Sequence, residues 1–136
     1  QRYLRLSEYA RFKKRKIQYA YYLRKKNLWG SKLGFSIHCG TFDIGLRIAH
    51  FGQIVVNGKA KIGKNCHLHG CNCIGNKNDN DELIPEIGDG FSLGYGSVVY
   101  GDRTICDNVI VGANSTINKS ISIPGIYVGL NKRVAE

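Results

Sequence analysis

Four histidines are the side chains of this sequence best suited to acid–base chemistry near neutral pH: His38, His50, His67 and His69. His50 lies six residues before Val56, in an uncharged stretch, AHFGQIVVN, whose glycine lets another molecule approach the backbone. A neutral imidazole can take the proton of a hydroxyl group, so His50 is the candidate general base. The alternative is a structural histidine without a chemical role.

Five cysteines could also carry chemistry, but no two have the C-x-x-C spacing of a zinc finger or ribbon. We expect them to be reduced thiols that behave as small buried hydrophobic side chains: Cys39, Cys66, Cys71, Cys73 and Cys106.

The chain has the length of one domain, with 136 residues and a formal net charge of +10. Residues 1–26 hold ten Lys or Arg and one acidic residue, whereas residues 27–136 hold ten Lys or Arg and nine acidic residues. Since one local segment carries the excess, we expect no nucleic-acid partner. No apolar run reaches the ~18 residues of a membrane span, and no signal peptide is visible, so the expected location is cytoplasmic.

The basic segment predicts a helical arm over residues 1–32. Within it, residues 7–26 read as one helix, with Ser7 as its N-cap and Gly30 as its stop. Its cations and aromatic rings could hold the protein at the periphery of an anionic membrane. Packing on the body or on a neighbouring subunit is favoured, because the apolar positions form no single stripe.

From residue 35 onward the chain repeats in units of six. Aliphatic residues recur at Val56, Ile62, Leu68 and Ile74, and again at Leu93, Val99, Ile105, Val111, Ile117 and Ile123. Small or polar residues often follow four places later. This hexapeptide pattern predicts a mainly β fold, a parallel β-helix over residues 33–136, in which three units form a coil and the coils stack. His50 falls where the register expects an aliphatic residue, so either the register breaks there or an imidazole enters the core.

One interruption lies between Ile74 and Ile87, which are 13 residues apart rather than 12. The polar segment between them predicts an inserted loop at residues 76–85. Repeat folds often place such insertions on a binding face.

The stretch IGLRIAHFGQIVVNGKAKIGKNCHLHGCNCIG, residues 44–75, resembles the hexapeptide-repeat acyltransferases. The likeness is strongest to the serine O-acetyltransferases and their polysaccharide-associated relatives. It implies a left-handed β-helix and makes His50 the general base. The resemblance puts Ser36 at the position of the aspartate that orients this histidine in serine enzymes. Asp43, the nearby acid, and His69 are further candidates for support.

The resemblance also implies acetyl-CoA as co-substrate, bound without metal in a groove between subunits of a homotrimer. By position it assigns the pantetheine arm to Gly75, Gly94, Tyr95, Gly112 and Ala113, and the CoA phosphates to Lys119, Lys132 and Arg133.

The expected function is therefore O-acetyl transfer from acetyl-CoA. The predicted acceptor is a sugar hydroxyl of a surface-polysaccharide precursor, because Ile84 stands where serine enzymes carry a substrate-binding histidine. The alternative is a serine O-acetyltransferase of cysteine biosynthesis. Two rivals remain: a non-catalytic scaffold, and a zinc protein like the gamma-class carbonic anhydrases using His50, His67 and His69. We expect residues 67 and 69 to face opposite ways, which disfavours zinc.

Overall fold

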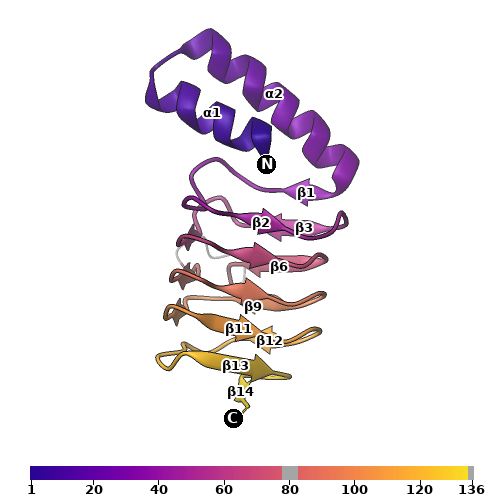
Figure 1. Cartoon of the computed structure of the whole chain (residues 1–136), viewed down its shortest axis with the longest axis vertical. Helices are drawn as coiled ribbons and strands as arrows, with labels where there is room; N and C mark the ends of the chain where they lie inside the picture. Colours follow the sequence, from indigo (N-terminus) through magenta and orange to yellow (C-terminus); the bar gives the residue numbers. More distant parts are fainter. Residues whose placement is uncertain (78–82, 135–136) are drawn as a thin grey trace.

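The computed structural model describes residues 1–77 and 83–134, and a helical hairpin caps one end of a stack of short strands (Figure 1). Helix α1 (Arg2–Phe12) and helix α2 (Lys16–Leu33) form the hairpin. No helix in the described ranges is both long and apolar enough to cross a membrane.

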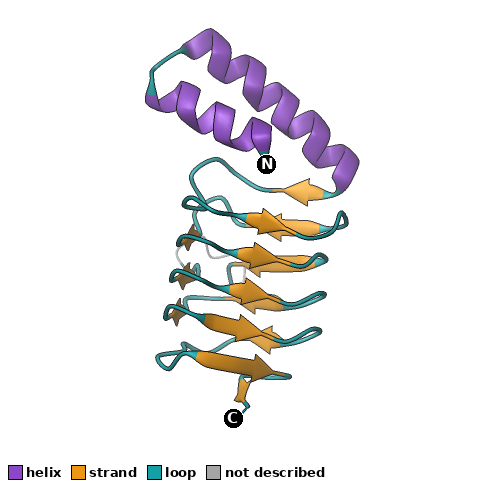
Figure 2. Ribbon diagram, in the orientation of Figure 1, coloured by secondary structure: helices purple, strands orange, loops and turns teal. Residues whose placement is uncertain are grey.

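The strands form three sheets that the chain visits in turn, so that each circuit adds one coil (Figure 2). The five-strand sheet holds β1 (Phe35–Ser36), β3 (Ile54–Val56), β6 (Asn72–Gly75), β9 (Val98–Tyr100) and β12 (Thr116–Ile117). The three-strand sheet holds β4 (Lys61–Ile62), β7 (Glu86–Ile87) and β10 (Thr104–Ile105). The six-strand sheet holds β2 (Arg47–Ile48), β5 (His67–Leu68), β8 (Ser92–Leu93), β11 (Val109–Val111), β13 (Gly125–Val128) and β14 (Lys132–Arg133). All pairings between these strands are parallel except β13 with β14.

The hexapeptide aliphatics point inward and fill the space between the three sheets. Leu68 lies between Ile48 and Leu93 in register, and Ile74 lies between Val56 and Val99. These repeat positions are buried from Val56 to Ile117. Each such side chain contributes about 1.5–3 kcal/mol when fully buried, so the column of aliphatics drives the stacking of coils. The predicted mainly β architecture with helices at the N-terminus is confirmed.

The predicted register is wrong at its last position. Ile123 is 57% exposed, and Ile121 is buried in its place opposite Ile105. Tyr127 then pairs with Val111, so the final coil is two residues shorter than the repeat. Half of the inserted loop predicted at 76–85, residues 78–82, lies outside the described residues. Its consequence is visible at its ends, since Ile62 pairs with Ile87 across it.

The prediction of one helix over 7–26 is also wrong, because the chain turns back at Lys13–Arg15. Ser7 is not an N-cap: it lies buried inside α1, and its hydroxyl donates to the carbonyl of Leu4 at 2.7 Å. Gly30 is not a stop. It lies inside α2, where a Cβ would come 2.7 Å from the carbonyl oxygen of Phe35, and the helix ends at Gly34 with φ +79°.

Candidate active site

His50 lies on an edge of the stack, where the chain passes from the six-strand to the five-strand sheet. We call this edge the His50 corner; it consists of the stacked turns at residues 49–53, 69–71, 94–96 and 112–114. The turn directly below His50 uses three residues, 69–71, between the paired positions Leu68 and Asn72. The turn that carries His50 uses five, since Ile48 pairs with Leu68 and Ile54 with Asn72.

The two additional residues decide where His50 points. Ile48 takes the sheet position beside Leu68, so the imidazole is not forced into the core, and His50 is exposed. Phe51 beside it is 80% exposed. The turn is held from above, because the backbone N–H of Gly52 donates to the carbonyl of Leu33 at 3.2 Å. The register break allowed for in the sequence is therefore present, and it presents the histidine to solvent.

Directly below His50, Gly70 leaves room for the ring of Tyr95. A Cβ on Gly70 would lie 3.1 Å from Cε2 of Tyr95 and 3.5 Å from Cβ of His50. The thiol of Cys71 donates a hydrogen bond to the Tyr95 hydroxyl at 3.0 Å. This bond, and the electrostatic interaction with the same thiol, raise the pKa of Tyr95, so the phenol stays neutral at neutral pH. An imidazole, a thiol and a phenol thus gather around one glycine.

A ladder of buried polar side chains fixes the turns of the corner from inside. The amide of Asn72 donates to the carbonyl of Gly94 at 2.7 Å and accepts from the N–H of Gly70 at 2.9 Å. One coil on, the hydroxyl of Ser97 donates to the carbonyl of Gly112 at 2.6 Å. The hydroxyl of Ser115 donates to the carbonyl of Ala113 in its own turn and accepts from the N–H of Gly129 one coil on. Buried polar groups need such partners, so these residues hold the corner in a single conformation. They occupy positions that the sequence pattern marks, four places after an aliphatic.

Small residues are required where the turns stack most closely. A Cβ on Gly94 would lie 2.7 Å from the backbone nitrogen of Ala113. Gly94, Tyr95, Gly112 and Ala113 therefore form a narrow strip of exposed or half-exposed backbone that runs down the corner from His50.

The other residues assigned to the cofactor lie elsewhere. Gly75 pairs with Tyr100 at the far end of its strand, and Lys119 follows the same edge of the five-strand sheet, where its backbone N–H donates to Asn131. Lys132 lies in β14, and Arg133 there donates to the carbonyl of Pro124 at 3.1 Å. The eight assigned residues thus fall in two groups, four on the His50 corner and four on the neighbouring edge or at the C-terminal coil.

None of the three candidates for orienting His50 touches it within the described residues. Asp43 lies on a different corner, next to the three-strand sheet, where its Oδ1 accepts from the N–H of Ile44 at 2.7 Å. Ser36 lies on the outermost strand of the five-strand sheet, opposite Val55. His69 lies 3.4 Å from Ser92, between its Nε2 and the serine Oγ.

The expectation that residues 67 and 69 face opposite ways is wrong. Their ring centroids are 4.1 Å apart, because residues two apart on a strand share a face. Burial, with the charges of His69 and Arg47, lowers the pKa of His67. In the described ranges, no three His, Cys, Asp or Glu side chains gather as a metal site.

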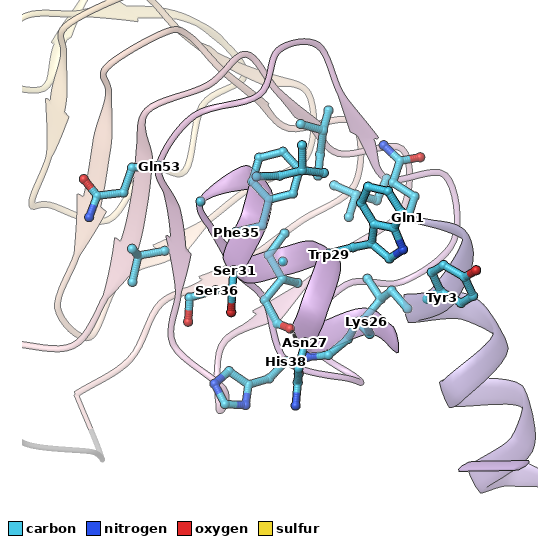
Figure 3. A pocket seen from close by; sticks show the side chains of 18 residues that line it. Gln1, Tyr3, Lys26, Asn27, Trp29, Ser31, Phe35, Ser36, His38 and Gln53 are labelled. Atoms are coloured by element: carbon cyan, nitrogen blue, oxygen red, sulfur yellow. Dashed lines mark hydrogen bonds between the residues drawn. The ribbon is translucent and has the colours of Figure 1, made fainter. Parts of the chain in front are cut away.

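A cavity of about 630 Å³ separates the hairpin from the first coil (Figure 3). Its walls include Trp29 and Phe35, and Ser36 and Gln53 reach it from the solenoid. Gln53 belongs to the turn that carries His50, so the cavity adjoins the His50 corner. Sequence reasoning missed this cavity, together with Phe51, Gly70 and Cys71; the only signal for Phe51 was its place beside His50.

Comparison with known proteins places this geometry in a family. Residues 85–119 match the model for "Bacterial transferase hexapeptide (six repeats)". The chain is 31% identical over 129 aligned positions to the putative colanic acid biosynthesis acetyltransferase WcaB of Escherichia coli K12, covering 82% of this chain and 79% of that protein. It is 33% identical over 100 positions to a serine acetyltransferase of Staphylococcus xylosus, covering 71% of this chain and 46% of the relative.

Among solved structures, a serine acetyltransferase from Brucella abortus in complex with coenzyme A superposes with a TM-score of 0.78, at 21% identity, over 99% of this chain and 54% of that one. The chain thus spans about half the length of the serine acetyltransferases that it matches. The fold and the sequence likeness together define a hexapeptide-repeat transferase. The chain belongs to the hexapeptide-repeat acetyltransferases.

Proposed function

We propose that the chain is an acetyl-CoA-dependent O-acetyltransferase, built as a left-handed parallel β-helix, with His50 as its general base. The observation that carries the proposal is the exposed imidazole of His50 on a five-residue turn, directly above the strip of small residues. An exposed imidazole without a hydrogen-bonding partner in the described chain is available to an incoming hydroxyl group.

The reaction needs one proton to move twice. His50 takes the proton of the acceptor hydroxyl as its oxygen attacks the thioester carbonyl of acetyl-CoA. The tetrahedral intermediate then collapses, the carbon–sulfur bond breaks, and the imidazolium returns the proton to the leaving thiolate. The products are the acetyl ester and free coenzyme A, and no metal is required at any step.

The donor is proposed to lie along the His50 corner. Gly94, Gly112 and Ala113 expose backbone there because their side chains are absent or small, which suits a pantetheine arm that bonds to peptide groups. Gly75, Lys119, Lys132 and Arg133 lie on the neighbouring edge or the last coil, and we assign the three cations to the CoA phosphates.

The acceptor is proposed to be a sugar hydroxyl of a surface-polysaccharide precursor. Phe51, the neighbour of His50 in the chain, and Tyr95, packed against Gly70 below it, expose aromatic rings, and the adjoining cavity adds Trp29. Flat apolar rings beside amide and hydroxyl groups suit the face of a sugar better than a small amino acid. Ile84 packs against the core and offers no polar group to serine. The runner-up, serine O-acetylation, is favoured by the 33% identity to a serine acetyltransferase.

We further propose that residues 33–136 form the catalytic body, residues 1–32 an accessory arm, and the whole a homotrimer. The support is that no described residue of the same chain orients His50, so a neighbouring subunit would complete the site around it. A ring of three copies closes one repeated contact. Light scattering is expected to give three times the chain mass; a monomer at micromolar concentration would contradict this.

The deciding experiment measures thiol release from acetyl-CoA with sugars and L-serine as competing acceptors. We expect acetyl transfer to a saccharide with a catalytic efficiency at or above about 10⁴ M⁻¹s⁻¹, and at least tenfold less with L-serine. Efficient acetylation of L-serine with no reacting sugar would make this a serine acetyltransferase. No thiol release with any acceptor would favour the scaffold.

A further inference from the structure

In the part of the chain that the structure describes, the hydrogen bonds between the hairpin and the solenoid involve α1 up to Glu8 and α2 from Lys26 onward. Arg5 donates to the carbonyl of Phe42, Glu8 accepts from the N–H of Gly40 at 2.9 Å, and Lys26 donates to the carbonyl of Ile37 at 2.6 Å. In the described chain, no hydrogen bond links residues 9–22 to the strands. The turn between α1 and α2 lies at the end of the hairpin remote from the solenoid (Figure 1).

This free end, residues 9–22, which we call the hairpin tip, combines positive charge with exposed apolar surface. Five cations fall within residues 11–16, and the tip contains no acid. Ile17 is 88% exposed and Phe12 is 77% exposed, two of the three highest values among the exposed large hydrophobic side chains of the described residues. Monomeric soluble surfaces rarely gather such side chains beside a cluster of like charge unless the patch contacts something.

The tip is ordered before it meets a partner. The N–H of Lys13 donates to the carbonyl of Tyr9 at 2.9 Å, and the N–H of Arg15 donates to that of Ala10 at 2.9 Å. Lys14 adopts a left-handed φ of +55°, a turn conformation that usually takes Gly or Asn. A cation is therefore kept at the apex of the turn despite the conformational cost.

We propose that the hairpin tip is a docking site for the surface of a membrane rich in anionic lipid, with Phe12 and Ile17 entering the interface and the surrounding cations facing the headgroups. Charge complementarity selects this occupant, because each Lys or Arg near an anionic surface strengthens partitioning by about fivefold. The Nζ of Lys13 lies 5.5 Å from the centroid of the Phe12 ring, so the charge and the apolar group reach the interface together.

The inference does not depend on acetyl transfer, because the His50 corner contacts the other end of α2, where the N–H of Gly52 donates to the carbonyl of Leu33. It would hold the protein beside lipid-anchored material while leaving the solenoid in water. Vesicle binding without any substrate therefore tests it separately from the proposed function.

The experiment is co-sedimentation of the full chain with phosphatidylcholine vesicles, with and without phosphatidylglycerol. We expect binding only to the anionic vesicles at about 0.1 M salt. At about 1 M salt the Debye length falls to about 3 Å, and binding should be lost. Phe12→Ser with Ile17→Ser, or Lys13→Gln with Lys14→Gln, should each weaken binding at least tenfold.

Matched control variants remove equal numbers of exposed apolar side chains and cations from the solenoid instead of the tip. Ile44→Ser with Leu130→Ser removes two exposed apolar side chains, and Lys64→Gln with Lys77→Gln removes two exposed cations. Both should bind like the parent. Equal loss in tip and control variants, or no binding of the parent, would overturn the proposal. A change of mass by light scattering in the tip variants, without vesicle binding by the parent, would show instead that the tip contacts a second copy.

Discussion

Gly70 and Tyr95 are packed so closely that the ring occupies the space of a missing side chain: a Cβ on Gly70 would lie 3.1 Å from Cε2 of Tyr95. Gly70 also has a φ of +129°, which L-residues rarely adopt. The close stacking below His50 thus depends on one glycine, and on its backbone conformation.

Gly70→Ala should lower the free energy of unfolding by about 1–3 kcal/mol through backbone strain. It should also displace Tyr95 and reduce acetyl transfer. Gly52→Ala is the matched control, because Gly52 shares the φ of +129° but its nearest neighbour would be Sγ of Cys71 at 3.5 Å. Denaturant unfolding of both variants measures the strain. If Gly70→Ala loses as much stability as Gly52→Ala but keeps its acetyl-transfer activity, the position of the Tyr95 ring has no role in the reaction.

His50→Ala should lower kcat by about 10²- to 10⁴-fold while leaving the melting temperature unchanged. The physical reason is that the imidazole is exposed and has no hydrogen-bonding partner in the described chain. His69→Ala, one coil below, should cost less. Steady-state kinetics with thermal unfolding checks both, and a His50 variant with parental kcat would remove the mechanism.

Stability should fall below about pH 6.5 because of His67. Its pKa is lowered in the folded protein, so the unfolded chain binds more protons between the folded value and the ordinary 6.5. The free energy of unfolding therefore decreases as pH falls through that window. His67→Gln should flatten this dependence in melting curves recorded from about pH 8 to about pH 5. A variant with the parental slope would assign the pH dependence to another group.

Alkylation with iodoacetamide should label Cys71 first and Cys66 last. Cys71 is exposed at the His50 corner, whereas burial raises the pKa of Cys66 to about 12 and keeps it a thiol. Coenzyme A should slow the labelling of Cys71 if the donor lies along this corner. Peptide mass spectrometry gives the labelling rates. If the rate for Cys71 is unchanged at a coenzyme A concentration sufficient for turnover, the donor binds elsewhere.

The solenoid could be predicted from the sequence because its determinants are local. One aliphatic side chain per six residues must be buried, and only stacked coils bury all of them, so Leu68, Ile74 and Val99 specify their own neighbours. The ladder of Asn72, Ser97 and Ser115 was visible for the same reason, as small or polar residues at a fixed offset. The pattern misled only at Ile123, where the last coil is shortened.

The arm and the candidate site could not be predicted to the same depth. Nothing in the sequence at Lys13–Arg15 is a helix breaker, and α1 folds back so that Leu4, Ser7 and Ala10 become buried. In the hexapeptide repeat, His50 occupies a position where an aliphatic residue is expected, and the repeat alone does not show whether its side chain enters the core or faces solvent. The pairing of Ile48 with Leu68 puts Ile48 at the core position and leaves His50 in solvent. The approach of Cys71 and Tyr95, 24 residues apart, depends on the inserted segment between Ile62 and Ile87. By itself the sequence determined which residues must be buried, because burial follows a local period. Only the tertiary structure decided which exposed residues meet, because that depends on how many residues each turn uses before the next coil begins.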